Sequence, residues 1–185
     1  MGNVKWISAG LCAGLLFSAG LSLADGTPQR TTSASAAAVP DRDFLMRALG
    51  VNQAEIVLGR MAIARGTTPE VRATGEKMVQ RHTELVRQLR ELAQIDPGAE
   101  PPTLTADQQR TSARLAAVSE SEFDRSFKTT VDAGHADELA MYREEVGRAA
   151  DPRLRALATG RVTALEQSLA SASQAANVPP RKRGW

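Results

Sequence analysis

The sequence predicts an all-α protein whose main domain is a four-helix bundle. Ala and Leu supply most of the apolar residues of the 185-residue chain, and only 4% of its residues are aromatic, which favours helix over strand. Apolar residues recur with steps of three and four through four long segments, as they do on the buried face of an amphipathic helix. No segment alternates apolar and polar residues with the period of two that is typical of a half-buried strand.

Helix-capping residues mark where the predicted helices begin. Thr68 and Asp151 each precede a proline, and proline is well tolerated in the first turn of a helix. Thr105 is followed by Gln108, and Ser119 is followed by Glu122; both pairs have the spacing of a capping box. With these starts, helices are expected over residues 43–65, 69–94, 105–117, 119–149 and 152–177.

The connections between these helices predict the topology. The first two long helices are joined by a tight turn, and so are the last two, whereas residues 95–119 form a long connection with its own short helix. Two helical hairpins joined by a long crossover are the layout of ferritin-like bundles. Because the crossover returns the chain to its starting end, the second and third long helices are expected to run parallel.

The two ends of the chain differ from this body. Residues 1–24 combine a basic start, an uncharged apolar stretch and small residues before a polar break, which predicts a signal peptide; an uncleaved anchor is the alternative. Residues 25–42 read as a flexible linker, residues 43–177 as the bundle domain and residues 178–185 as a basic tail. The protein is therefore expected in the periplasm or in association with the outer membrane.

Charge and motifs exclude several function classes. A formal charge of +2 is too balanced for a nucleic-acid-binding protein. Cys12, the single cysteine, lies inside the predicted signal, so the mature chain has no thiol nucleophile. Neither a phosphate-binding glycine loop nor a G-x-S-x-G motif is present. We expect a non-enzymatic envelope protein without catalytic residues, whose partner and oligomeric state the sequence does not identify. The tail residues Arg181, Lys182 and Arg183 either contact an anionic membrane surface or form a solvated end.

Polar residues on the apolar faces are the one chemical signal. Glu55, His82, His135 and Glu138 lie on or beside positions where the helical pattern requires apolar side chains, and the chain has only two histidines. Their heights in the predicted bundle are similar, so that two imidazoles and two carboxylates can converge at its middle. Such a donor set suits a single transition-metal ion, so the alternative to a non-enzymatic envelope protein is a metal-binding or ferritin-like redox protein.

Two other interpretations of these residues stay open. In the first, they pair without an ion, with His82 bonded to Glu55 and His135 bonded to a hydroxyl such as that of Ser168, since buried polar groups require partners. In the second, one or more of them face solvent.

Short motifs give the chain a family resemblance. The stretches A-E-I-V-L-G (residues 54–59), M-V-Q-R-H-T (78–83) and F-D-x-x-F (123–127), together with His135, occur in this order. They resemble the exported bacterial family of domain of unknown function 4142, which is grouped with ferritin-like folds. The resemblance covers residues 43–175 and implies a ferritin-like bundle in the periplasm or at the outer membrane, with no established reaction.

The chain also departs from this family. Arg81 stands where the family has Asp before the histidine, Val162-Thr163 replaces Leu-Pro, and Ser168 replaces a histidine. Di-iron bundles carry Glu-x-x-His on two helices, whereas His135 precedes Glu138 here. These departures argue against a di-iron oxidase and in favour of at most one ion.

Overall fold

The computed structural model describes residues 38–96 and 98–177, which form five helices and no strand. The predicted signal peptide, most of the linker and the basic tail lie outside these residues, so those assignments stay predictions. Among the described helices, none has the length and apolar character needed to cross a membrane. The helices are α1 (Ala38–Arg65), α2 (Pro69–Ala93), α3 (Ala106–Ala117), α4 (Glu120–Arg148) and α5 (Pro152–Ala176).

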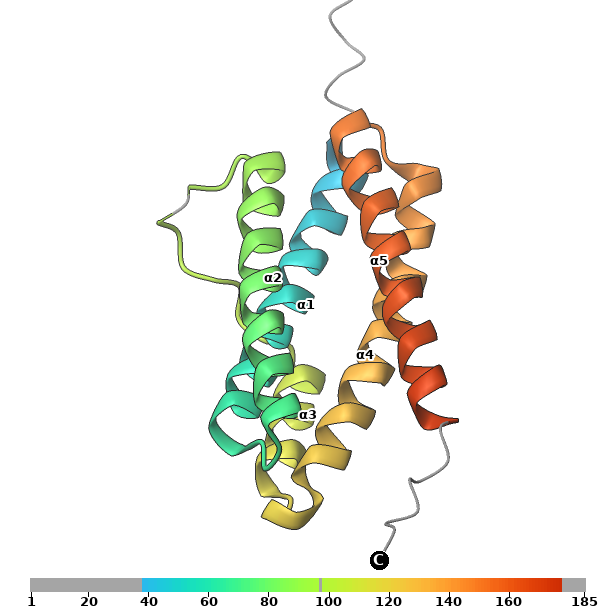
Figure 1. The fold of residues 1–185 in the computed structure, drawn as a ribbon. Coiled ribbons are helices and arrows are strands. Elements are labelled where there is room, and N and C mark those ends of the chain that lie inside the picture. Colours follow the sequence, from blue (N-terminus) through green and yellow to red (C-terminus); the bar gives the residue numbers. More distant parts are fainter. Residues whose placement is uncertain (1–37, 97, 178–185) are drawn as a thin grey trace, which may run out of the picture. The chain divides into compact units, whose positions relative to one another are not determined.

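The four long helices are arranged as two hairpins (Figure 1). Helix α1 packs along α2, α4 packs along α5, and α1 contacts α4 where the two hairpins meet. The short helix α3 lies in the crossover and packs against α1 and α4. The crossover returns the chain to the opposite end of the bundle, so α4 runs in the same direction as α2 (Figure 1), as the sequence predicted.

Three of the four predicted N-caps have the expected hydrogen bonds. Thr68 accepts from the backbone N–H of the third residue after it, at 3.4 Å, and Asp151 accepts at 2.8 Å from Arg153 N–H. Both bonds of the capping box join Thr105 and Gln108. Ser119 differs, because its side chain makes no bond to the helix backbone and its hydroxyl donates instead to the Glu122 carboxylate at 3.0 Å.

The first helix begins at Ala38, earlier than the expected boundary at residue 43. Asp41 explains why this turn belongs to the bundle. Its carboxylate is 7% exposed and accepts the backbone N–H groups of Ala150 at 3.1 Å and Asp151 at 2.9 Å. The start of α1 is thereby bonded to the turn between α4 and α5.

The buried apolar residues form two clusters, one toward each end of the bundle. One cluster contains the first turns of α1 and the last turns of α2 and α4, and includes Phe44, Leu89 and Tyr142. The other contains the opposite ends of the same helices, and includes Met78 and Phe127. Between the two clusters lies a layer of buried polar side chains: Asn52, Glu55, His82, His135, Glu138 and Arg161.

Candidate metal centre

Glu55, His82 and His135 converge in this polar layer from three different helices. Each offers one donor atom, and the three donor atoms lie within 4.8 Å of one another. Their exposed fractions are 4%, 1% and 6%. The structure therefore brings together three of the four residues predicted from the sequence, and none of them faces solvent.

Asn52 orients the ring of His82. The Asn52 side-chain N–H donates to the backbone carbonyl of Ala48 at 2.8 Å, so that its oxygen faces His82 Nδ1, also at 2.8 Å. The network assigns the proton to Nδ1, which leaves the Nε2 lone pair of His82 as a potential metal ligand. The sequence predicted Glu55 as the partner of His82. The partner is instead Asn52, which lies in α1 one turn before Glu55.

His135 is held in a similar way by the last helix. Its Nδ1 lies 3.2 Å from the hydroxyl oxygen of Ser168 in α5, which is the predicted partner. Its Nε2 is buried and has no hydrogen-bond partner among the described residues. Ser168 thus fixes one side of the ring and leaves the other nitrogen facing the cluster.

Glu55 brings the carboxylate of the cluster. Its Oε2 is also buried without a hydrogen-bond partner among the described residues. A Cβ built on Gly134 would lie only 3.0 Å from Glu55 Oε1, so the space beside this carboxylate depends on glycine at that position.

Glu138 differs from the expectation that it joins the other three. Its two oxygens accept hydrogen bonds from Arg161 Nε at 2.9 Å and from an Arg161 terminal nitrogen at 2.6 Å. The exposed fractions of the two side chains in this ion pair are 0% and 3%. A bidentate, buried partner occupies the Glu138 carboxylate, so Glu138 is removed from the candidate ligand set.

The electrostatics of the cluster keep its members neutral near pH 7. Burial, and next the charge of Glu138, raise the pKa of Glu55 from 4.5 to about 8. Burial, and next the charge of Arg161, lower the pKa of His82 from 6.5 to about 2 and the pKa of His135 from 6.5 to about 4. Unprotonated imidazole is the form that binds metals.

The donor set fits a transition-metal ion. Ligand atoms about 2.1 Å from a tetrahedral ion lie roughly 3.4 Å apart, so donor atoms within 4.8 Å of one another would move closer together on binding an ion. Two of the buried polar atoms, Glu55 Oε2 and His135 Nε2, are those that a cation would bond. Both histidines bind an oxygen through Nδ1, which is the outer-shell pattern of metal-bound histidines.

Two residues of the polar layer were missed by the sequence reasoning, namely Asn52 and Arg161. Each is spaced three or four residues from the buried apolar residues of its own helix. Arg161 continues the spacing of four, three and four from Leu154 and Ala158 to Leu165. This spacing could have predicted that Arg161 is buried. It did not do so because Val162, the next residue, fits an apolar helix face equally well.

Comparisons with known proteins agree with the helical fold. Solved structures described as CopM in the Cu(II)-bound, Cu(I)-bound and apo forms superpose with TM-scores of 0.61, 0.60 and 0.59. Their sequence identities are 15%, 17% and 16%, and each comparison covers 72% of this chain and 93% of the other. At these identities the similarity is one of fold. No curated protein matches the sequence.

Residues 26–175 match the family described as domain of unknown function DUF4142. This range includes α1, α2, α3, α4 and all but the last residue of α5. The chain therefore belongs to the DUF4142 family.

Proposed function

We propose that this protein binds a single divalent transition-metal ion through Glu55, His82 and His135. The observation that carries the proposal is the convergence of three buried residues, each of which offers one donor atom within 4.8 Å of the others. Glu55 Oε2 and His135 Nε2 in addition have no hydrogen-bond partner among the described residues. Buried polar groups are normally hydrogen-bonded, and those that are not call for an explanation. A bound cation is that explanation here.

The chemistry of the donors narrows the choice of ion. Two imidazole nitrogens and one carboxylate oxygen suit Zn(II), Cu(II), Ni(II) and Fe(II) better than the hard ions Mg(II) and Ca(II). The structural neighbours described as CopM include Cu(I)-bound and Cu(II)-bound forms, which supports testing copper first. When bound, the ion would supply Lewis acidity or redox chemistry, while the protein supplies neutral imidazoles and a carboxyl that releases its proton.

The proposed role is binding and holding of the ion by an exported, ferritin-like protein rather than catalysis. The crossover topology and the resemblance noted above support the ferritin-like assignment, and the N-terminal segment supports export. Di-iron proteins of this fold use two Glu-x-x-His motifs and further carboxylates. With Glu138 bound to Arg161, three ligands remain, which is enough for one ion and not for two.

Native mass spectrometry and metal titration of the purified chain test the proposal. We expect one Cu(II), Zn(II) or Co(II) per chain, and for Cu(II) an electron paramagnetic resonance spectrum with coupling to two imidazoles. The chain has only His82 and His135, so two coupled imidazoles identify both ligands. A folded protein whose melting temperature and spectra do not respond to any of these ions refutes the proposal.

A matched pair of variants separates ligation from simple loss of a buried carboxylate. Glu55→Gln removes a proposed ligand, whereas Glu145→Gln alters another buried glutamate of the bundle that also has one oxygen without a hydrogen-bond partner among the described residues. We expect the Glu55 variant to lose at least one to two orders of magnitude in metal affinity, because even the loss of an outer-shell partner of a ligand costs about that much. The Glu145 variant should bind as the wild type does.

A further inference from the structure

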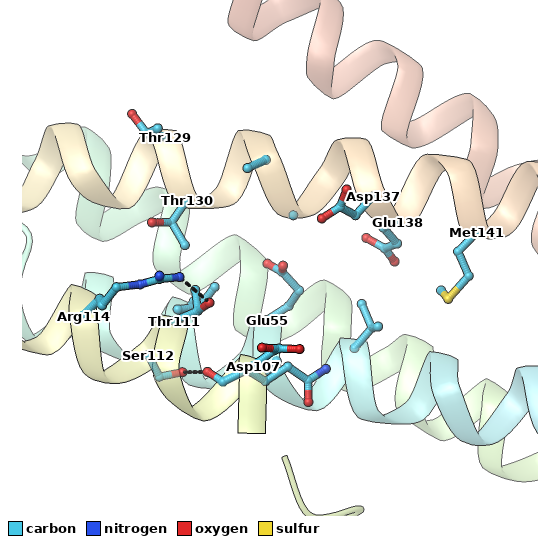
Figure 2. A pocket seen from close by; sticks show the side chains of 16 residues that line it. Glu55, Asp107, Thr111, Ser112, Arg114, Thr129, Thr130, Asp137, Glu138 and Met141 are labelled. Atoms are coloured by element: carbon cyan, nitrogen blue, oxygen red, sulfur yellow. Dashed lines mark hydrogen bonds between the residues drawn. The ribbon is translucent and has the colours of Figure 1, made fainter. Parts of the chain in front are cut away.

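A pocket of about 600 Å³ opens between α1, α3 and α4 and reaches the proposed metal centre (Figure 2). Glu55 is the member of the three-residue cluster that lines it; His82 and His135 do not. Glu55 is 4% exposed and its Oε2 has no hydrogen-bond partner among the described residues. A buried carboxyl oxygen without a partner is energetically unfavourable, so its position at the inner end of an open pocket calls for an explanation.

Gly134 keeps this inner end open. It lines the pocket, and a Cβ at this position would come within 3.0 Å of Glu55 Oε1. Any side chain here would therefore stand between the pocket and the carboxyl. Glycine in the middle of a helix lowers helix stability by about 1 kcal/mol relative to alanine, so the space beside Glu55 is kept at some cost to α4.

The two histidines of the cluster do not line the pocket. His82 is 1% exposed and His135 is 6% exposed, and each ring is held by a side chain of a neighbouring helix. Beside them, Arg161 of α5 and Glu138 of α4 form a buried ion pair. Of the three proposed ligands only Glu55 lines the pocket, so the pocket meets the cluster at Glu55.

Charge along the pocket favours cations. Asp107 of α3 and Asp137 of α4 line the pocket as exposed carboxylates, and Figure 2 shows them near Glu55 and Glu138. Glu55 is protonated near pH 7 and Glu138 is paired with Arg161, so the negative charge of the pocket comes from the two aspartates. Arg114 is the basic residue among the lining side chains. A concave surface with an excess of carboxylates concentrates cations and raises their rate of association.

We propose that this pocket is the route by which a divalent cation enters and leaves the metal centre, and that Glu55 is the first buried ligand that the ion meets. The inference rests on the proposed function, because it concerns the same three ligands. It adds a specific path, between α1, α3 and α4, and assigns the crossover helix α3 as one wall of that path.

Rapid-mixing kinetics with Co(II) test the route. Uptake of Co(II) by the purified chain and its removal by EDTA are followed by absorbance. Ala133→Phe and Thr111→Phe narrow the pocket from α4 and from α3 respectively. The matched control is Ala136→Phe, because Ala136 is exposed on the same helix as Ala133 but does not line the pocket.

We expect each pocket variant to slow uptake and removal together by about tenfold, and to leave the dissociation constant within about threefold, because obstruction changes rates and not equilibrium. The control should keep wild-type rates. Folded pocket variants that exchange Co(II) as fast as the wild type overturn the route while leaving the proposed function intact. If one of the two pocket variants does not fold, the other one, on the opposite wall of the pocket, tests the route. A wild-type chain that binds no Co(II), Cu(II) or Zn(II) overturns the proposed function and the route with it.

Discussion

Glu55→Gln replaces a buried carboxyl, 4% exposed, by a neutral amide of nearly the same shape, and so isolates the cost of ionising this group inside the bundle. In the metal-free protein, burial and the charge of Glu138 raise the pKa of Glu55 from 4.5 to about 8. Between these two pH values the folded chain retains a proton that the unfolded chain releases. The stability that Glu55 contributes is therefore complete below pH 4.5 and is lost as the pH rises through about 8.

The size of the effect follows from the same two pKa values. Each tenfold change in proton affinity is worth about 1.4 kcal/mol, so the full change from pH 4.5 to pH 9 is on the order of 5 kcal/mol. The glutamine variant carries no titrating group at residue 55. Its free energy of unfolding, minus that of the wild type, should therefore increase across this range.

The histidines act in the opposite direction. Burial lowers the pKa of His82 to about 2 and that of His135 to about 4. The unfolded chain binds protons at these residues below about pH 6.5 while the folded chain does not, so stability falls as the pH drops below that value. To a first approximation this loss is common to the wild type and the variant, and the difference between them isolates Glu55.

Urea denaturation with EDTA present, at five pH values from 5 to 9, measures the effect. The control is Glu76→Gln, which removes an exposed carboxyl of α2. A difference for Glu55→Gln that does not change with pH, within about 0.5 kcal/mol, would show that the carboxyl ionises as easily in the folded chain as in the unfolded one. The reasoning from burial would then be wrong.

Three further perturbations test the packing around the centre. Arg161→Leu should lower the free energy of unfolding by about 3–5 kcal/mol because it leaves Glu138 charged and buried, and adding Glu138→Leu should recover most of that loss in urea denaturation. Gly75→Ala should destabilise the bundle by about 1–3 kcal/mol, since its Cβ would lie 2.6 Å from a backbone oxygen of α1. Gly160→Ala is the comparison, because a Cβ there meets nothing within 4 Å and the melting temperature should rise with a gain of up to about 1 kcal/mol. Leu165→Ala should cost about 2–5 kcal/mol by calorimetry, because this side chain is 1% exposed; a loss below about 0.5 kcal/mol would contradict its burial.

Helix existence and helix ends were predictable because they depend on neighbours in sequence. The side chains of Thr68, Thr105 and Asp151 accept hydrogen bonds from backbone N–H groups only two or three residues away. Apolar residues spaced three and four apart predict which face of a helix is buried. The same periodicity placed Glu55 and His82 on the apolar faces of their helices, with solvent exposure left open as an alternative. The start of α1 was not predictable in this way, since Asp41 belongs to the bundle through bonds to residues 150 and 151.

What the sequence determined by itself is that Glu55, His82 and His135 lie on or beside the apolar faces of their helices; whether they bind an ion, pair with one another or face solvent stayed open. Only the tertiary structure decided which partner each of them has. Whether Glu138 meets an ion or Arg161 depends on the rotation of α5 against α4, and a rotation of one residue exchanges Arg161 for Val162 at that contact. The pocket at Gly134 and Glu55 likewise exists only once α3 is packed against α1 and α4. Local patterns specify directions around one helix axis, whereas the distance between two side chains depends on how two helices are placed.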